Sequence, residues 1–493
     1  MPDGPRPIEG VWEGKLEVGG VELRLVLRVS QESDGSLSAT VDSPDQGAMD
    51  LKVGAIELGD GGVTRFEMKT LSAMFEGTRD DVGATIVGDF TQAGTSLPLI
   101  LRWRERASEL RRPQEPQEPY PYRAEEVRYQ DRAGGATLAG TLTIPTGQGL
   151  FPAALLITGS GPQDRDESVF GHKPFLVLAD YLTRMGIGVL RVDDRGVGGS
   201  TGQTRNVTSE DLAGDVEAGV ALLKTRPEID PAKIGLIGHS EGGIIAPMVA
   251  ARSSEVAYIV LMASPGLPGE EILIRQGALV AKAEGRSDEQ ITVNRDIQKR
   301  LFQIIRSEKD PQVAEARIRL TIREGLARLS AADQDAASDT AAFVESQVQI
   351  AQSPWLRFFL TYDPRPALRR VKCPVLAING ERDLQVPAEE NLAAIEGALR
   401  DGHNPRMTVQ VLPRLNHLFQ TSETGRVSEY ARNEETIAPI ALELIGSWIK
   451  DQVKARWSQP MFDLTGPQLD SLALSATLVN GINVDRADRA AAA

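Results

Sequence analysis

The sequence has a single cysteine and no long apolar run. One cysteine, Cys373, excludes an intrachain disulfide and a cysteine-rich metal site. A membrane-spanning helix needs about 20 apolar residues in succession, and the sequence has no such stretch. We therefore expect no membrane span. Cys373 precedes an apolar strand pattern and is predicted to be a packed core thiol.

Positive charge is also scarce. The chain carries 54 lysines and arginines against 69 aspartates and glutamates, a net charge of −15. An acidic surface does not attract nucleic acids or anionic lipids, so we expect neither as a partner; homo-oligomerisation stays open. The N-terminal MPDGPRPIEG lacks the basic-then-apolar pattern of an export signal. The protein is expected to be cytoplasmic as given, although an exported protein without its signal peptide would look the same.

The first 104 residues alternate between apolar and polar positions. In VELRLVLRV, one face carries Val21, Leu23, Leu25, Leu27 and Val29. Short strands at regular spacing predict a small antiparallel barrel or sandwich over residues 1–104, and the opening GVWEG resembles the strand entry of lipocalin-like barrels. Such a barrel could hold a ligand or serve as an accessory domain. The further strands are expected at 37–41, 51–56, 63–68, 73–78, 84–90 and 97–103.

Prolines with charged and amide residues mark 105–122, where RASELRRPQEPQEPYPY favours a semi-extended, solvated linker. Strand and helix patterns then alternate, which predicts a parallel sheet with helices on both faces. Thr208, followed three residues later by Asp211, predicts the start of one of these helices. The α/β core is expected in two parts, 123–264 and 371–456, with a tail over 457–493. Its helices are expected at 174–185, 209–225, 241–252 and 436–454.

The connection between residues 262 and 375 is far longer than the dozen or so residues that a crossover helix needs. Helix patterns at 270–284, 288–308, 311–328 and 339–351 predict a helical cap over 265–370, covering the carboxyl ends of the strands. Trp355, Phe358 and Phe359 follow in SPWLRFFLTYDP. They are expected either to line an acyl pocket or to anchor the core of the cap.

The stretch KIGLIGHSEGGIIAPMVA places Ser240 between an apolar strand and a helix of small residues. Gly238 and Gly242 leave room for a tight turn that raises the serine hydroxyl above the sheet. The N–H of Glu241 then lies at the N-terminus of the next helix, where it favours a developing oxyanion. The alternative is a packing turn between strand and helix without chemistry.

A nucleophilic serine needs a histidine base oriented by a carboxylate. Of the four histidines, His239 is expected to be structural, and His172 and His403 are expected in surface loops. His417 follows the strand TVQVLP at the sheet edge where the serine emerges, and is predicted to be the base.

The acid is expected after another strand, in NGERD, and the chain order serine, acid, histidine suits this architecture. Asp383 is preferred over its competitor Glu381 because its spacing carries it past the turn. The second oxyanion donor is expected in the loop TGSG, with the N–H of Ser160 as first choice and that of Gly161 as second. This loop lacks the lysine of a phosphate-binding P-loop.

Together, the motifs TGSGPQDRDE, RVDDRGVGGSTG, GHSEGG, NGERDLQVP and NHLF resemble the α/β-hydrolase superfamily, and more narrowly bacterial serine carboxylesterases with an N-terminal β domain and a helical cap. The resemblance covers residues 125–454. It implies hydrolysis of short-to-medium acyl esters of small molecules, without metal or organic cofactor. Thioesterases and serine peptidases share the fold, and a lipid-binding protein with secondary hydrolase activity is the alternative from another class.

Overall fold

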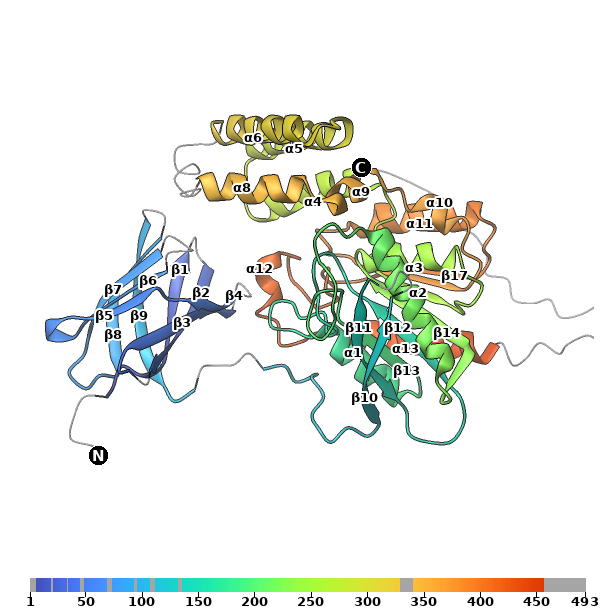
Figure 1. Cartoon of the computed structure of the whole chain (residues 1–493), viewed down its shortest axis with the longest axis horizontal. Helices are drawn as coiled ribbons and strands as arrows, with labels where there is room; N and C mark the ends of the chain where they lie inside the picture. The colour runs from blue at the N-terminus through green and yellow to red at the C-terminus, as the bar shows by residue number, and fades with distance from the viewer. Residues whose placement is uncertain are drawn as a thin grey trace, which may run out of the picture.

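The computed structural model describes residues 6–18, 21–32, 34–44, 48–68, 73–92, 95–106, 111–131, 135–328 and 340–455. It contains a nine-stranded and an eight-stranded sheet. Figure 1 shows the two sheets side by side, with a layer of helices above them. The tail predicted over 457–493 lies outside the described residues.

The nine-stranded sheet is antiparallel and has the order β4-β3-β2-β1-β9-β8-β7-β6-β5. Its edge strands, β4 and β5, are consecutive in the chain. The N–H groups of Val53 and Gly54, between them, donate to Ala39 O in β3 and Glu67 O in β6. The sheet therefore curls so that its edges approach. The single strand predicted over 51–56 is wrong, because the chain passes there from one edge to the other. The strands are β1 Gly10–Val18, β2 Val21–Gln31, β3 Leu37–Ser43, β4 Ala48–Lys52, β5 Ala55–Leu58, β6 Val63–Met68, β7 Ala73–Arg79, β8 Thr85–Gln92 and β9 Thr95–Arg104.

Large side chains pack against one another within this curled sheet. Trp12, Phe66 and Phe75 are at most 2% exposed. The Phe66 and Phe75 rings stack with centroids 5.0 Å apart, and the Trp12 indole N–H donates to Ile8 O at 2.7 Å. The sheet thus has a hydrophobic core of its own.

The eight-stranded sheet has the order β10-β11-β13-β12-β14-β15-β16-β17. β10 and β11 form an antiparallel edge, and the strands from β13 to β17 run parallel. The predicted mostly parallel sheet is confirmed. Its strands are β10 Arg123–Gln130, β11 Thr137–Ile144, β12 Phe151–Ile157, β13 Gly188–Val192, β14 Ile229–His239, β15 Ile259–Met262, β16 Val375–Gly380 and β17 Met407–Leu412.

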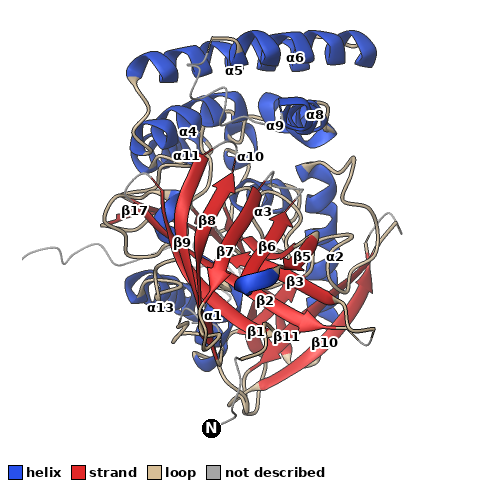
Figure 2. Ribbon diagram, turned by 90° about the vertical axis from the view of Figure 1, so that its left-hand side faces the viewer, coloured by secondary structure: helices blue, strands red, loops and turns tan. Residues whose placement is uncertain are grey.

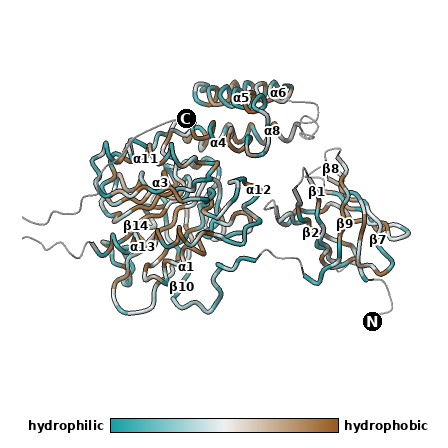
Figure 3. The backbone as a smooth tube through the Cα atoms, turned by 180° about the vertical axis from the view of Figure 1, so that it is seen from behind, coloured by the Kyte–Doolittle hydropathy of each residue, from teal (hydrophilic) through white to brown (hydrophobic). Residues whose placement is uncertain are grey.

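Both faces of this sheet are buried, and Figure 3 shows the hydrophobic colour concentrated along its strands. Successive residues of β12 point to opposite faces: Leu155 and Ile157 pack in one cluster, and Ala154 and Leu156 in the other. Helices α2 (Ser209–Thr225), α3 (Gly242–Ala250) and α11 (Ala388–Asp401) cover the first face, and α1 (Pro174–Arg184) and α13 (Pro439–Ala455) cover the second. Helix α11 was not predicted from the sequence.

The region between β15 and β16 forms the cap, which Figure 2 shows as two layers, with α5 and α6 above α4, α8 and α9. Helix α9 joins the cap to the sheet domain, because Phe359 packs in a core cluster of the sheet whereas Leu356 and Leu360 pack in the cluster of the cap. Residues 329–339, which include the predicted start of one cap helix, lie outside the described residues. The helices are α4 Gly269–Ala283, α5 Asp288–Ser307, α6 Pro311–Leu326, α8 Thr340–Ala351, α9 Pro354–Thr361 and α10 Arg365–Leu368.

The segment between the two sheets is extended, but it is not solvated throughout as predicted. Tyr122 is 8% exposed, and its hydroxyl donates to Asp180 Oδ1 at 2.9 Å. Arg112 and Gln114 make hydrogen bonds to loops around the eight-stranded sheet. Residues 107–110 of the predicted linker lie outside the described part of the chain.

Candidate active site

Ser240 occupies the turn between β14 and α3. Its φ of +50° lies in the left-handed region that side chains disfavour, and its N–H donates to Met262 O at 2.8 Å. A Cβ on Gly238 would lie 2.0 Å from Gly242 O, and a Cβ on Gly242 would lie 2.1 Å from Ile157 O. Only glycine fits on either side of this turn, so Ser240 is displayed above the sheet, as its motif predicts.

Asp383 and His417 meet above the ends of β16 and β17. His417 Nδ1 lies 2.8 Å from Asp383 Oδ2, and both side chains are at most 5% exposed. Asp383 Oδ1 accepts the N–H groups of Gln385 and Val386, each at 2.8 Å. Glu381, the competing acid, is exposed and accepts the N–H of Arg414 at 2.9 Å. The carboxylate that contacts the histidine is therefore that of Asp383.

A cavity of about 330 Å³ brings Ser240 and His417 together beneath the cap. Of the three aromatic residues considered for a pocket, Trp355 and Phe359 line this cavity, with their rings stacked 5.2 Å apart. Phe358 is not among the lining residues; its ring stacks on Tyr362 at 5.4 Å. Other lining residues include Ser160, Glu241, Ile272, Leu273, Gln276, Gln385 and Tyr430.

The loop after β12 also reaches this cavity. Ser160 and Gly161 are exposed, and Gly161 has a φ of +94°. The N–H of Gly159 is occupied by Glu167 Oε1 at 2.7 Å. Ser160 and Gly161 are thus left as the candidate donors of this loop, as expected from the sequence.

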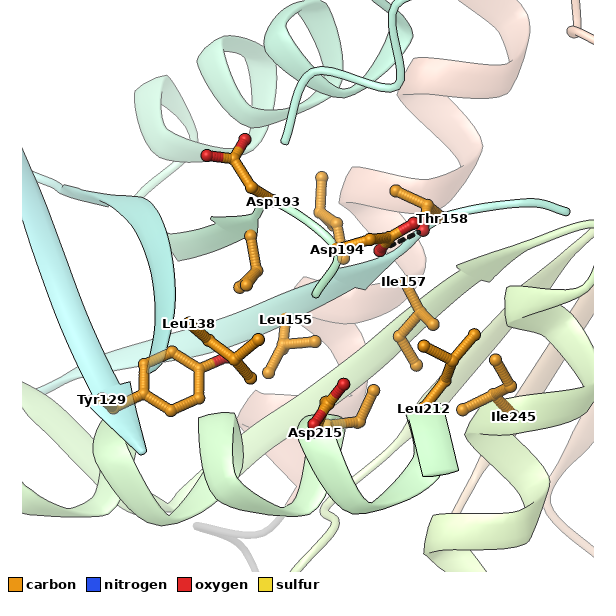
Figure 4. Close-up of a pocket in the computed structure, with 13 residues that line it drawn as sticks. Tyr129, Leu138, Leu155, Ile157, Thr158, Asp193, Asp194, Leu212, Asp215 and Ile245 are labelled. Atoms are coloured by element: carbon orange, nitrogen blue, oxygen red, sulfur yellow. Dashed lines mark hydrogen bonds between the residues drawn. The ribbon is translucent and has the colours of Figure 1, made fainter. Parts of the chain in front are cut away.

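Asp194 holds both ends of the same loop. It accepts the hydroxyl of Thr158 at 3.0 Å, drawn as a dashed line in Figure 4, and the N–H of Gln163 at 2.9 Å. Burial raises the pKa of Asp194 to about 7, although these hydrogen bonds oppose the rise. The cavity of Figure 4, about 40 Å³, lies beside this carboxyl and has room for one or two waters.

The side chain of Glu241 has a structural role that was not predicted from the sequence. It is 2% exposed, and its Oε1 accepts the Ser209 hydroxyl at 2.6 Å and the Trp355 indole N–H at 2.8 Å. Burial raises the pKa of Glu241, while hydrogen bonds from Ser209, Trp355 and Ser160 oppose the rise. One carboxyl therefore links the serine turn, α2 and cap helix α9.

His239 forms a second histidine–carboxylate pair behind the first. Its Nδ1 lies 2.9 Å from Glu167 Oε1, its Nε2 lies 3.0 Å from His417 O, and its ring centroid lies 4.9 Å from that of His417. Burial lowers the pKa of His239, but the charge and hydrogen bond of Glu167 and the bond to His417 O together outweigh it, so the pKa is raised. A structural role for His239 was predicted; Glu167, 72 positions earlier, was not.

The prediction for His172 is wrong. Its side chain is not in a surface loop but fully buried, at 0% exposed, with Nδ1 2.9 Å from Thr436 Oγ1 and Nε2 2.9 Å from Tyr430 O. Burial, followed by the charge of Arg112, lowers the pKa of His172 to about 4, which keeps its ring neutral. His403 is exposed, as expected.

Within the described ranges, no cluster of three or more histidine, cysteine, aspartate or glutamate residues could bind a metal ion. No described helix combines the length and apolar character needed to cross a membrane.

Comparison with known proteins gives both close sequence matches over part of the chain and more distant structural matches. Esterase EstD of Thermotoga maritima is 35% identical over 136 residues, which cover 28% of this chain and 32% of EstD. An uncharacterized protein of Mycobacterium tuberculosis is 30% identical over 126 residues, covering 26% of this chain and 41% of that protein. The chain thus spans less than half the length of these curated relatives.

Two solved esterases are similar at low identity. The Pyrococcus furiosus esterase Pf2001 has a TM-score of 0.42 and 16% identity, covering 70% of this chain and 97% of that chain. Est1E of Butyrivibrio proteoclasticus, solved with ferulic acid, has a TM-score of 0.40 and 16% identity, covering 68% of this chain and 100% of that chain.

The family model described as the alpha/beta hydrolase family matches residues 154–429. This match runs from within β12 to within α12 (Val427–Tyr430) and covers more than half of the chain. It includes the turn of Ser240 and the pair Asp383 and His417. By this match, the chain belongs to the α/β hydrolase family.

Proposed function

We propose that this hydrolase is a serine carboxylesterase that cleaves short-to-medium acyl esters of small molecules through an acyl-enzyme. The observation that carries the proposal is the shared cavity: it is lined by Ser240, on its left-handed turn, and by His417, whose Nδ1 is bonded to Asp383. A hydroxyl nucleophile, an imidazole and an orienting carboxylate are the groups that acyl transfer requires.

In the first half-reaction, Ser240 Oγ attacks the acyl carbon while His417 Nε2 takes the hydroxyl proton. Asp383 accepts from Nδ1 and stabilises the imidazolium that forms. The oxyanion is held by the N–H of Glu241, at the N-terminus of α3, and by that of Ser160. The C–O bond to the alcohol then breaks, and His417 returns the proton to the leaving oxygen.

In the second half-reaction, water attacks the acyl-enzyme. His417 takes one proton of the water, the same two N–H groups hold the oxyanion, and the proton passes to Ser240 Oγ as the acid is released. Each turnover consumes one ester and one water and needs no metal or organic cofactor.

The cavity supports the preference for short-to-medium chains. Its volume of about 330 Å³ lies at the small end of ligand pockets. Trp355 and Phe359 form an apolar wall on which each buried methylene gains about 0.8 kcal/mol until the space is filled.

Thioester or peptide cleavage is the alternative within the fold. A lipid-binding function of the curled sheet is disfavoured by its core, because Trp12, Phe66 and Phe75 occupy the interior that a ligand would need. That the partial relative EstD is called an esterase also favours ester cleavage.

The test is a panel of p-nitrophenyl esters of increasing acyl length, acyl-CoA thioesters and a peptide, assayed with the parent and with Ser240→Ala. We expect hydrolysis of the shorter esters and a loss of about four to six orders of magnitude in kcat in the variant. Near-parent activity in Ser240→Ala, or preference for the thioesters or the peptide, would contradict the proposal.

A further inference from the structure

Arg112 precedes the eight-stranded sheet, yet its guanidinium group reaches two loops beside the active site. Nε donates to Gly171 O at 2.9 Å, and Nη2 donates to Phe170 O at 3.3 Å and to Ala431 O at 2.8 Å. Nη1 donates to Asn433 O at 2.6 Å. An arginine presents five N–H donors in a rigid plane, so one side chain joins loops that lie about 260 residues apart in sequence.

Gln114 secures the second of these loops further along. Its Oε1 accepts the N–H groups of Thr436 and Ile437, at 2.5 and 3.1 Å, and its Nε2 donates to Ile437 O at 2.6 Å. Residues 431–437 are therefore held at both ends by the segment that follows the curled sheet. Figure 1 shows the described part of this segment, from residue 111 on, leading to β10.

The clamped loop, residues 431–437, is hydrogen-bonded to the loop that contains His417, the proposed general base. Gln420, three residues after His417, donates to Tyr430 O at 3.2 Å and accepts from the side chain of Asn433 at 3.2 Å. Asn433 is also a carbonyl partner of Arg112. Gln420 and Tyr430 are both fully buried, at 0% exposed, where a hydrogen bond is stronger than in water.

Tyr430 provides a second route to His417. Its side chain is fully buried at 0% exposed, and its ring lies edge-on to Phe170 with centroids 5.4 Å apart. Its phenol oxygen accepts from Gln385 Nε2 at 3.3 Å, and the N–H of Gln385 donates to Asp383 Oδ1 at 2.8 Å. Burial, followed by the charge of Asp383, raises the pKa of Tyr430. The phenol thus connects the clamped loops, through Gln385, to Asp383, the hydrogen-bond partner of His417.

We propose that Arg112 is a positioning residue for His417: by holding residues 170–171 and 431–433 together, it fixes Tyr430 and Gln420 and, through them, the imidazole. This inference rests on the proposed function for the role of His417. Because a displacement of about 1 Å at a catalytic group can reduce the rate 100-fold, loss of the clamp should appear in kcat more than in KM.

The test compares Arg112→Ala, Arg112→Lys and Tyr430→Phe with the matched control Arg111→Ala, whose side chain is exposed. At a temperature where every variant is folded, we expect Arg112→Ala to lower kcat about 10- to 100-fold with little change in KM. Lysine, a point charge with three donors, should recover part of the rate. The control should match the parent.

Two further measurements separate positioning from general destabilisation. A double-mutant cycle of Arg112→Ala with Tyr430→Phe should be non-additive, because the two residues act along one route. The low-field proton resonance of the His417–Asp383 hydrogen bond should shift or broaden in both single variants but not in Arg111→Ala. If Arg112→Ala does not fold, Arg112→Lys and Tyr430→Phe carry the same test.

The proposal is overturned if both Arg112 variants keep the parent kcat and resonance and lose only thermal stability, or if the cycle is additive. The proton resonance needs no substrate. A hydrolytically active Ser240→Ala would therefore refute the proposed function while the resonance still decides the role of Arg112.

Discussion

Asp383 contacts His417 with one carboxylate oxygen and its own turn with the other. We expect Asp383→Asn to lower kcat about 10⁴-fold, because an amide favours the wrong histidine tautomer and cannot stabilise the imidazolium. Glu381→Gln is the matched control, since Glu381 lies two residues away and bonds to Arg414 N–H instead. Steady-state kinetics on a p-nitrophenyl ester would measure both, and a larger loss in the control would assign the acid to Glu381.

The raised pKa of Asp194 predicts that the free energy of unfolding depends on pH. Its pKa is about 7 in the folded protein against an ordinary value of 3.8. Between these two values the folded state therefore holds a proton that the unfolded state has lost. The contribution of Asp194 to the free energy of unfolding should then fall as pH rises from about 4 to 7, by an amount on the order of 4 kcal/mol.

Asp194→Asn removes this titration and keeps an acceptor for Thr158 or Gln163. Chemical denaturation of both proteins at several pH values gives the difference in their free energies of unfolding. We expect the parent to lose stability relative to the variant across this range, with no further change above pH 8. A difference that stays constant with pH would show that Asp194 does not titrate there.

At the scale of elements, Trp355 and Phe359 of α9 line the cavity, whereas Phe358 does not. Phe359→Ala should move the preferred acyl length upward, because the removed ring leaves space for further methylenes at about 0.8 kcal/mol each. Phe358→Ala is the control: its ring stacks on Tyr362, so it should lower the melting temperature without changing the preference. A series of p-nitrophenyl esters would reveal the shift, and identical profiles would exclude Phe359 from selection.

Thr208 is the N-cap of α2, the helix start predicted from the sequence, and the structure shows a capping box there. Thr208 Oγ1 accepts the N–H of Asp211 at 3.4 Å, and Asp211 Oδ2 accepts the N–H of Thr208 at 2.8 Å. Thr208→Ala should lower the free energy of unfolding by about 1 kcal/mol, and Thr208→Ser, which keeps the acceptor, should restore most of it. Urea denaturation would measure both; equal losses would mean that the methyl group, not the hydroxyl, matters.

At the scale of the whole molecule, the two sheets have separate cores, so the curled sheet should be removable. The position of the cut is decisive. A chain starting at residue 107 keeps Arg112 and Gln114 and should retain most of the parent kcat. A chain starting at Tyr120 lacks both residues, and its kcat should fall about as far as that of Arg112→Ala. Kinetics and melting temperatures of both chains would test this, and equal activity would show that the clamp is dispensable.

Local patterns in the sequence predicted most helices and strands, because the burial of one face and the steric limits of a turn act over a few residues. The period of the apolar residues reflects which face of a strand or helix is buried, and the glycines around Ser240 reflect atoms that would collide within the turn itself. Local patterns failed where a strand had to end for a tertiary reason, as at Val53, and where an amphipathic segment such as α11 lay between stronger signals.

The sequence by itself determined the α/β sheet, the turn of Ser240 and the strand ends from which Asp383 and His417 emerge. Steric limits and periodicity act over a few residues and are visible in the order of the side chains. Only the tertiary structure decided that Glu167 pairs with His239, that Glu241 reaches Trp355, and that Arg112 bonds to Ala431. These partners are 72, 114 and 319 positions apart, so they meet only when separate loops are brought to one edge of the sheet, where buried polar groups must find hydrogen bonds.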